Sequence, residues 1–238
     1  MKYHFQYKET IVNIVCDEPY LNVAEDAIFE ARKIIEDKVA EDEFFKITYE
    51  PYRASPKDHE LIQRMCNASL LSDVGPFAGV AGAVATYSVE KMHSKNANLA
   101  IVENGGDIAF LSHEPKIIGL FADHPVLKDI AFKIQSDRIT GICSSSAKIG
   151  PSVSLGKSNV CTVFSDDVIL ADCCATALGN LIRDGGQEEM SSALETIGSK
   201  DGVSGCVSIS NGLMAMFGSV PELIRADHGE VTASSIIF

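Results

Sequence analysis

The chain has 238 residues, of which 46% are hydrophobic and 22% charged, as in an ordinary soluble globular protein. This length is enough for one large domain or two small ones with a real hydrophobic core. The formal net charge of −13 argues against nucleic acid or an anionic membrane as the partner, because both would repel the chain.

The composition also bears on the compartment in which the protein works. The residues from Met1 to Lys8 alternate between polar and aromatic types and lack the apolar region of a signal peptide. The longest uncharged stretch, 74–89, is too short for a membrane span and predicts a buried helix. The seven cysteines are odd in number and form no Cys-x-x-Cys pair, which favours reduced thiols over a disulfide framework. We therefore expect a cytoplasmic protein.

In the first half of the chain, short alternating segments precede helical ones. A period of two residues predicts strands, and a period of 3.6 residues predicts helices. The side chains of Asn22 and Glu25 have the spacing of a capping box at the start of the first helix. A polar loop at 52–58 precedes two helices that are separated by Gly75-Pro76. Strands are predicted at 3–7, 11–15 and 44–49, and helices at 22–39, 60–71 and 77–92.

Strand patterns dominate the second half, with two helices between them and a loop rich in Gly and Ser at 150–159. Strands are predicted at 98–103, 108–112, 116–121, 130–134, 160–164, 203–208, 213–217 and 232–238, and helices at 166–183 and 190–196. Strand pairs separated by helix pairs indicate an α+β fold with largely antiparallel sheets. No linker divides the chain, so we expect one domain over 1–238. The order of elements hints at two similar halves, although the residues themselves show no repeat.

The segment from Ser165 to Ile182 is apolar around almost its whole helical circumference, which predicts a buried helix. Asp172 and Thr176, four residues apart, share one stripe of this helix. A buried carboxylate needs a partner, and Mg²⁺ would be one, because it accepts carboxylate and hydroxyl oxygens as ligands. Two alternatives stay open: Asp172 could cap a helix that starts later, and Thr176 could donate back to the carbonyl of Asp172.

The stretch Asn104-Gly105-Gly106-Asp107 joins two predicted strands. Asn-Gly is a hairpin signal, because both positions of a type I′ turn need positive φ. A second glycine and an aspartate exceed the needs of that turn, which leaves open that backbone N–H groups and a carboxylate face a ligand. Cys143 could be a nucleophile only with a base beside it, and is otherwise a small buried hydrophobe.

Several motifs occur in a fixed order, and together they resemble the ApbE-like superfamily. The motifs are Val74–Ala85, Glu103–Asp107, Cys143–Ser146, the Gly-x-Ser-x-Ser-x-Gly-Lys stretch at 150–157, and Leu170–Asn180. The best-known members of the superfamily are magnesium-dependent FAD:protein FMN transferases. The chain is most similar to an uncharacterised branch of stand-alone cytoplasmic proteins, and the likeness is good over 60–182.

The resemblance implies a duplicated T-fold-like ApbE architecture and a site for Mg²⁺ with FAD or FMN. It implies that Asp172 and Thr176 hold the metal and serve catalysis. The residues that the resemblance implies at the flavin nucleotide are Asn104, Gly105, Gly106, Asp107, Ser144, Ser145 and Ser152. The implied partner is a small-molecule nucleotide or another phosphorylated ligand, with a homo-oligomer left open.

The chain also departs from the transferase pattern. Ala81-Gly82-Ala83 stands where transferases carry Lys-Gly-Tyr, their His-His-Ile-x-Asp-Pro stretch has no counterpart, and Pro151 stands where the nearer branch tends to have His. The function expected is a magnesium-assisted flavin-nucleotide or related site, with FMN or phosphoryl-type transfer. Two alternatives remain: a non-transferase accessory protein of sulfide assimilation, with Cys143 beside the loop, and a binding module without catalysis.

Overall fold

A computed structural model describes residues 1–120, 127, 129–146, 160–227 and 229–234. The strands in these residues are β1 (Lys2–Tyr7), β2 (Thr10–Cys16), β3 (Leu99–Asn104), β4 (Asp107–Gly119), β5 (Ile130–Ser145), β6 (Val160–Ser165), β7 (Val203–Ser210), β8 (Leu213–Gly218), β9 (Glu222–Arg225) and β10 (Ala233–Ser234). The helices are the 3₁₀ turns η1 (Glu18–Tyr20) and η2 (Pro76–Gly79), and α1 (Leu21–Glu41), α2 (Phe44–Ile47), α3 (Glu60–Ser72), α4 (Val80–Ser94), α5 (Val168–Leu181) and α6 (Gln187–Gly198).

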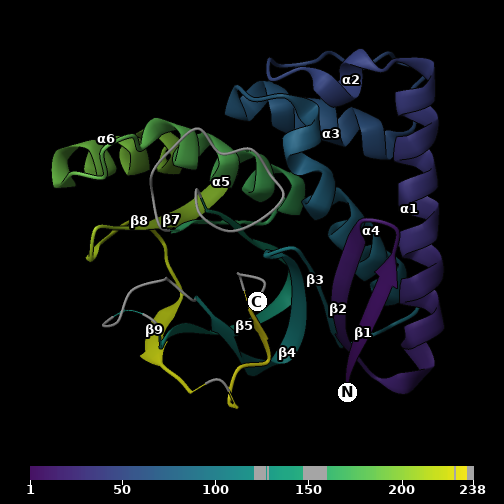
Figure 1. Ribbon diagram of the computed structural model, residues 1–238. Coiled ribbons are helices and arrows are strands. Elements are labelled where there is room, and N and C mark those ends of the chain that lie inside the picture. Colours follow the sequence, from purple (N-terminus) through teal and green to yellow (C-terminus); the bar gives the residue numbers. More distant parts are fainter. Residues whose placement is uncertain (121–126, 128, 147–159, 228, 235–238) are drawn as a thin grey trace.

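The strands form one sheet with helices gathered on one side (Figure 1). β1 to β8 lie side by side in the order of the chain, and each neighbouring pair is antiparallel. β9 pairs antiparallel with β5, and β10 pairs parallel with β4. The expected α+β class with largely antiparallel pairing is therefore confirmed.

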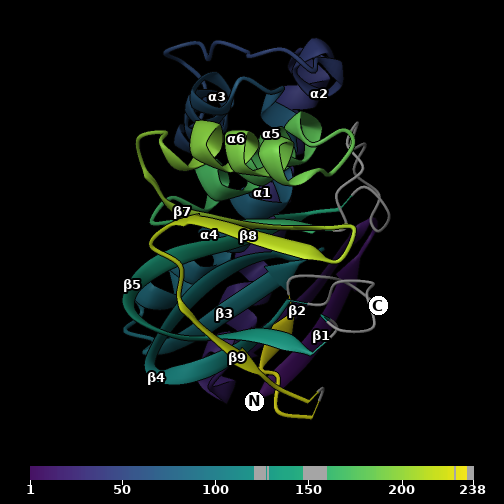
Figure 2. The same cartoon turned by 90° about the vertical axis from the view of Figure 1, so that its left-hand side faces the viewer.

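The sheet has an apolar core on each face. The larger core lies between the sheet and the helices, with α4 and α5 packed at its centre. The smaller core lies on the other face, where long β4 and β5 curve and where Phe132 and Phe164 pack edge to face at 5.0 Å (Figure 2). Successive side chains of a strand point to opposite faces. Ile142 and its neighbour Cys143 accordingly belong to different cores.

The first helix is confirmed, but the predicted capping box is wrong. α1 begins at Leu21, and the 3₁₀ turn η1 before it provides the carbonyl of Glu18 for the N–H of Leu21. Asn22 therefore lies inside the helix and caps nothing. The buried residues of α1 include Ala24, Ile28, Ala31 and Ile35, which recur at the spacing of one helix face.

The strand predicted at 44–49 is wrong, because this segment forms the short helix α2. Asp42 accepts a hydrogen bond from the backbone N–H of Phe44 at 3.0 Å and thereby starts a helical turn. Phe45 alone is buried, against the rings of Tyr52 and Phe77, and no strand of the sheet is adjacent to it. Side-chain hydrophobicity suggested a strand here, whereas the local cap decides the backbone conformation.

The strands of the second half are longer than predicted. The predicted segments 108–112 and 116–121 both overlap one strand, β4, which ends at Gly119 and has register shifts near Ser112. β5 continues from Ile130 to Ser145. β9 was not predicted, and only Ala233–Ser234 of the last predicted strand is described as a strand. The Gly/Ser-rich loop at 150–159 lies outside the described residues.

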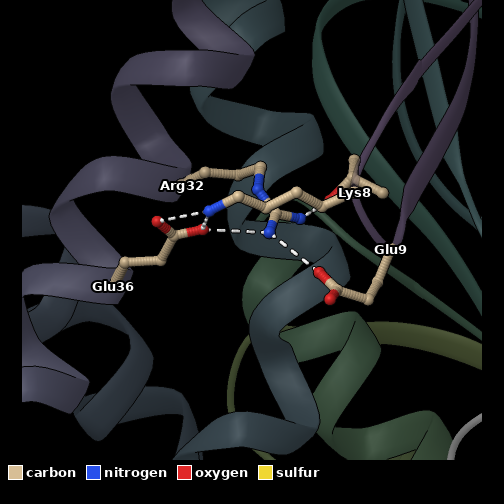
Figure 3. A network of polar contacts seen from close by, with 5 residues as sticks. Lys8, Glu9, Arg32 and Glu36 are labelled. Carbon is tan, nitrogen blue, oxygen red and sulfur yellow. Dashed lines mark hydrogen bonds and ion pairs between the residues drawn. The ribbon is translucent and has the colours of Figure 1, made fainter.

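The β1–β2 hairpin is attached to α1 by a polar network (Figure 3). Arg32 of α1 donates to the hydroxyl of Thr10 and forms ion pairs with Glu9 at 3.1 Å and with Glu36 at 3.0 Å. Lys8 also pairs with Glu36, at 3.0 Å. This network holds the outer hairpin against the helix layer, because Arg32 joins both elements.

The long uncharged stretch forms η2 and the first part of α4, and Gly82 to Val89 are buried as predicted. No single helix in the described ranges has both the length and the apolar character needed to cross a bilayer. α3 and the η2–α4 segment meet those criteria only together, as a pair bent by 113°. All seven cysteines lie in the described part of the chain, where each is buried and none forms a disulfide bond.

Candidate carboxylate site at the β3–β4 hairpin

The β3–β4 hairpin turns at Gly105-Gly106, one residue later than the Asn-Gly pattern suggested. Asn104 and Asp107 form the last pair of the strand ladder, and the φ angles of the two glycines are 69° and 98°. Both positions of such a two-residue turn need positive φ. The second glycine is thus required by the turn and is not by itself a sign of a ligand.

Glu103 fastens this turn, a role that the sequence analysis missed. Its carboxylate accepts a hydrogen bond from the Asn13 side chain at 2.7 Å and another from the backbone N–H of Gly106. Burial raises the pKa of Glu103, although both hydrogen bonds oppose that change. The N–H of Gly106 therefore already has a protein partner. A glutamate at the buried end of an apolar strand was the available signal.

Asp172 lies within α5, as predicted, and is 6% exposed. It does not cap its own helix, because Asp167 does so by accepting from the N–H groups of Ile169 at 2.9 Å and Leu170 at 3.2 Å. The Asp172 carboxylate instead reaches the first turn of α4.

There, Asp172 Oδ2 accepts from the backbone N–H of Gly82 at 2.8 Å, and the carboxylate also accepts from that of Ala81. It satisfies two of the free amides at the start of α4, where the helix dipole favours negative charge. A Cβ at Gly82 would lie 2.9 Å from the Val168 carbonyl oxygen and 3.0 Å from the Asp172 Cβ. Glycine at this position thus lets the two helices approach closely enough for the bond.

Asp107 is the second buried carboxylate at this place, with 8% exposure. Its Oδ1 accepts from the backbone N–H of Ser144 at 3.2 Å, and the Cys143 thiol donates to it as well. The pKa of Asp107 is raised well above its usual value, first by burial and then by the negative charge of Asp172. Burial raises the pKa of Asp172 to about 7, against the opposing bonds from α4.

The remaining predicted residues divide between the two faces of the sheet. Asn104 is half-buried and donates from Nδ2 to the carbonyl of Ala81 at 3.2 Å, so it contacts the same turn of α4 as Asp172 does. Ser145 is buried and follows the alternation of β5 onto the helix-covered face. The Ser144 side chain points to the opposite face, where its hydroxyl bonds that of Thr162 at 2.7 Å.

Two of the predicted residues are more exposed than the carboxylate pair, and a third lies outside the described residues. Thr176 is half-buried one helical turn after Asp172. Gly105 is exposed at the tip of the hairpin. Ser152 lies outside the described residues. The structure thus brings Asn104, Asp107 and Asp172 together and directs the Ser144 hydroxyl away from them.

Cys143 does not have the surroundings of a nucleophile. Its sulfur lies 3.5 Å from the Val168 carbonyl oxygen, and its thiol also bonds Asp107. The pKa of Cys143 is raised well above its ordinary value by burial, and then by the charges of Asp107 and Asp172. Because the thiolate is the reactive form, burial and these charges disfavour reaction at this thiol. Cys143 is a buried hydrogen-bond donor. It therefore does not support a role as an accessible thiol in sulfur chemistry.

A pair of buried carboxylates with raised pKa values can retain a proton or bind a hard cation. Among the described residues, no three His, Cys, Asp or Glu side chains cluster as a set of metal ligands. Any cation between Asp107 and Asp172 would therefore need oxygen atoms from hydroxyl or backbone groups, water or a bound ligand. This composition suits Mg²⁺, which usually keeps several waters and takes one or two carboxylates.

Solved structures share the fold of this chain. The ApbE protein of Thermotoga maritima matches with a TM-score of 0.63 at 14% identity, over 92% of this chain and 97% of that one. The flavin transferase ApbE of Vibrio cholerae matches with a TM-score of 0.58 at 12% identity, over 92% and 96%. The apo flavinyl transferase ApbE of Pseudomonas stutzeri matches with a TM-score of 0.60 at 11% identity, over 91% of this chain and 93% of that one. At these identities the likeness shows the ApbE fold alone.

Sequence relatives are much more similar. A protein named UPF0280 from Methanococcoides burtonii is 42% identical over 229 residues, which cover 95% of this chain and 96% of the relative. One from Archaeoglobus fulgidus is 42% identical over 232 residues, covering 96% and 97%. A family model described as AbpE bacteria matches residues 1–195. The chain therefore belongs to this ApbE-like family, together with the archaeal UPF0280 proteins.

Proposed function

We propose that the protein binds Mg²⁺ between Asp107 and Asp172 and, through it, the phosphates of a flavin nucleotide such as FAD. One observation carries the proposal: two buried aspartates from different elements lie close enough for the charge of Asp172 to raise the pKa of Asp107. Two like charges at one buried place are costly without a counter-charge. A divalent cation would remove that cost, whereas a single proton shared by the pair removes only part of it.

The groups around the pair fit such a cation. The amides of Ala81 and Gly82 fix the orientation of Asp172, and the N–H of Ser144 fixes that of Asp107. Fixed carboxylates bind a metal with less loss of side-chain freedom. We propose the hydroxyl of Thr176, on the same stripe of α5, as a further protein oxygen for the site. Asn104 would hold the hairpin against α4 while the cation is bound.

The same geometry indicates how phosphates would be bound. The start of α4 would ordinarily bind an anion, but the Asp172 carboxylate already occupies the amides of Ala81 and Gly82. A phosphate at this place would therefore have to be bound through the cation. Mg²⁺, when bound, would neutralise phosphate charge and polarise the pyrophosphate of FAD. The exposed Gly105 would leave room for a ligand beside the turn.

The flavin part of the proposal is supported by the ApbE fold and by the ordered motifs. If transfer occurs, an acceptor hydroxyl forms a bond to the phosphorus of the FMN moiety, the pyrophosphate bond of FAD breaks, and AMP leaves with its electron pair. The hydroxyl proton passes to solvent or to a basic group. The lysine of the transferase pattern is replaced by the Ala81-Gly82-Ala83 stretch, so we propose binding and transfer as two separable properties.

The experiment is titration calorimetry in three steps. MgCl₂ is titrated into protein pretreated with EDTA, and FAD is then titrated with Mg²⁺ present and with EDTA in its place. Asp172→Asn and Asp107→Asn keep the side-chain shape but remove the charge. Asp166→Asn is the matched control, because this exposed aspartate forms only a surface ion pair with Arg138 at 3.0 Å.

We expect Mg²⁺ binding and Mg²⁺-dependent FAD binding in the parent and in Asp166→Asn, with at least a tenfold loss in the two site variants. FAD that binds equally well in EDTA, or Mg²⁺ affinity that survives both site substitutions, would refute the site. Transfer is tested separately by chromatography of AMP released from FAD with Mg²⁺. Binding without AMP release would leave the protein as a binding module and would remove the catalytic half of the proposal.

A further inference from the structure

The two edges of the sheet differ in how they are protected. Within the described ranges, β1 and β8 each pair with a single strand. Unpaired edges tend to pair with other chains unless charge, proline or a bulge prevents it. β1 carries such protection, with Lys2, His4 and Gln6 exposed along it and Lys8 at its end.

β8 carries none of these devices. Its sequence is Leu-Met-Ala-Met-Phe-Gly, and the whole stretch from Ser210 to Pro221 holds no charged residue. Its ladder with β7 runs without a register shift. Leu213, Met216 and Phe217 are 47%, 51% and 37% exposed, respectively. Figure 2 shows β8 at the outer side of the sheet, below α6.

We propose that β8 pairs antiparallel with β8 of a second copy, so that the two sheets continue into each other in a twofold-symmetric dimer. A second copy suits this strand because the apolar edge is complementary to itself, and among possible contacts between two copies charge favours this one. Each chain carries a net charge of −13, so two copies repel each other over most of their surfaces. The uncharged β8 edge lets them meet without opposing like charges, whereas pairing through β1 would bring two basic edges together.

The backbone of β8 also determines the register. Asn211-Gly212 is a two-residue turn with φ angles of 50° and 76°, closed by the pair Ser210 and Leu213. In such a hairpin the closing pair is hydrogen-bonded, and alternate residues point their N–H and C=O groups to the other side. Met214 and Met216 therefore direct their backbone groups outward, away from β7.

A twofold axis perpendicular to the sheet then places Met214 opposite Met216 of the second copy, with Ala215 on the axis. Each Met214–Met216 pair exchanges two backbone hydrogen bonds, which uses the outward groups of both strands. On the helix-covered face, Leu213 would lie opposite Phe217 of the second copy. This arrangement closes on itself, so it produces a dimer and not a fibre.

The experiment is sedimentation velocity of the full chain over a wide concentration range, at low and high salt. A single strand edge covers less area than a standard interface of about 800 Å² per partner, so we expect a dimer that dissociates on dilution. High salt should strengthen the dimer, because it screens the repulsion between two acidic chains. Met216→Lys should weaken association at least tenfold by placing charge at the edge.

Three further variants separate the backbone pairing from nonspecific hydrophobic association. Met216→Pro removes an outward N–H without removing a bond to β7, whereas Met216→Val keeps that N–H. Ile47→Lys changes an apolar side chain that is 59% exposed on α2, a helix that packs against α1 and η2. We expect loss of dimer for Met216→Pro and a dimer for Met216→Val and Ile47→Lys, with all variants melting cooperatively.

Three results would overturn the proposal: a monomer at every concentration, a dimer that survives both Met216→Lys and Met216→Pro, or open-ended assemblies in place of a dimer. These results are independent of Mg²⁺ and flavin binding. The dimer proposal and the proposed function can therefore fail separately.

Discussion

The free energy of unfolding should depend on pH through Asp172. Its pKa in the folded protein, about 7, lies about three pH units above the ordinary value of 3.8. The folded state therefore retains a proton that the unfolded chain loses, and stability falls as pH rises from about 4 to about 7. One pH unit corresponds to about 1.4 kcal/mol, so the whole effect is on the order of 4 kcal/mol.

The substitution that tests this effect is Asp172→Asn, because asparagine keeps an oxygen for the Gly82 amide and carries no charge. It also removes the charge that raises the pKa of Asp107, which acts in the same direction. Urea unfolding of the parent and the variant in EDTA, at about pH 5 and about pH 8, gives the difference in stability at each pH. The variant should gain about 3 kcal/mol relative to the parent between these two values, since about two pH units of the window are crossed.

Carboxylates whose pKa values are lowered, such as Asp58 beside Lys38, affect both proteins equally and mostly below this range. Their contributions to stability cancel in the comparison between the parent and Asp172→Asn. A difference in stability that stays the same at both pH values would refute the buried Asp172 carboxylate on which the proposed site depends. Mg²⁺ should stabilise the parent at the higher pH and leave Asp172→Asn unchanged, because a ligand of the folded state adds to its stability.

Three further outcomes follow from the packing around the site. Gly82→Ala should destabilise the fold by about 1–3 kcal/mol in thermal melts, because its Cβ would crowd the Val168 carbonyl and Asp172. Asn13→Ala should cost about 1–3 kcal/mol in urea unfolding, and more at higher pH, because it removes a donor from the buried Glu103 carboxylate. The seven buried thiols should react with a thiol reagent only after denaturant is added, so fast labelling of the native protein would contradict their burial.

The sequence predicts the elements of the site better than it predicts their contacts. The apolar circumference of the 165–182 segment correctly placed Asp172 on a buried helix, since that property is local. Its partner is the amide of Gly82, 90 residues earlier in the chain, and no periodicity reports on such a contact. The hairpin was predicted from Asn104-Gly105, but the turn moved by one residue because the strand ladder extends to Asp107.

The face of the sheet to which each side chain points was the hardest property to predict. Ser144 and Ser145 looked equivalent as long as the strand before them was expected to end at 134. Because β5 continues to Ser145, its alternation sends the Ser144 hydroxyl to the smaller core and Ser145 to the helix-covered face. An error of strand length thus became an error of side-chain direction, and a single sequence contains no local signal that would correct it.

Asp172 can act as a helix cap and as a metal ligand at once, and its geometry shows why the two roles do not exclude each other. Capping α4 needs one acceptor oxygen near the amides of Gly82 and Ala81, which asparagine also provides. Holding a cation opposite Asp107 needs charge, which asparagine lacks. If Asp172 were only a cap, its charge would weaken the fold beside a second carboxylate. A neutral cap would avoid that repulsion, whereas the proposed cation site requires the charge of aspartate at this position.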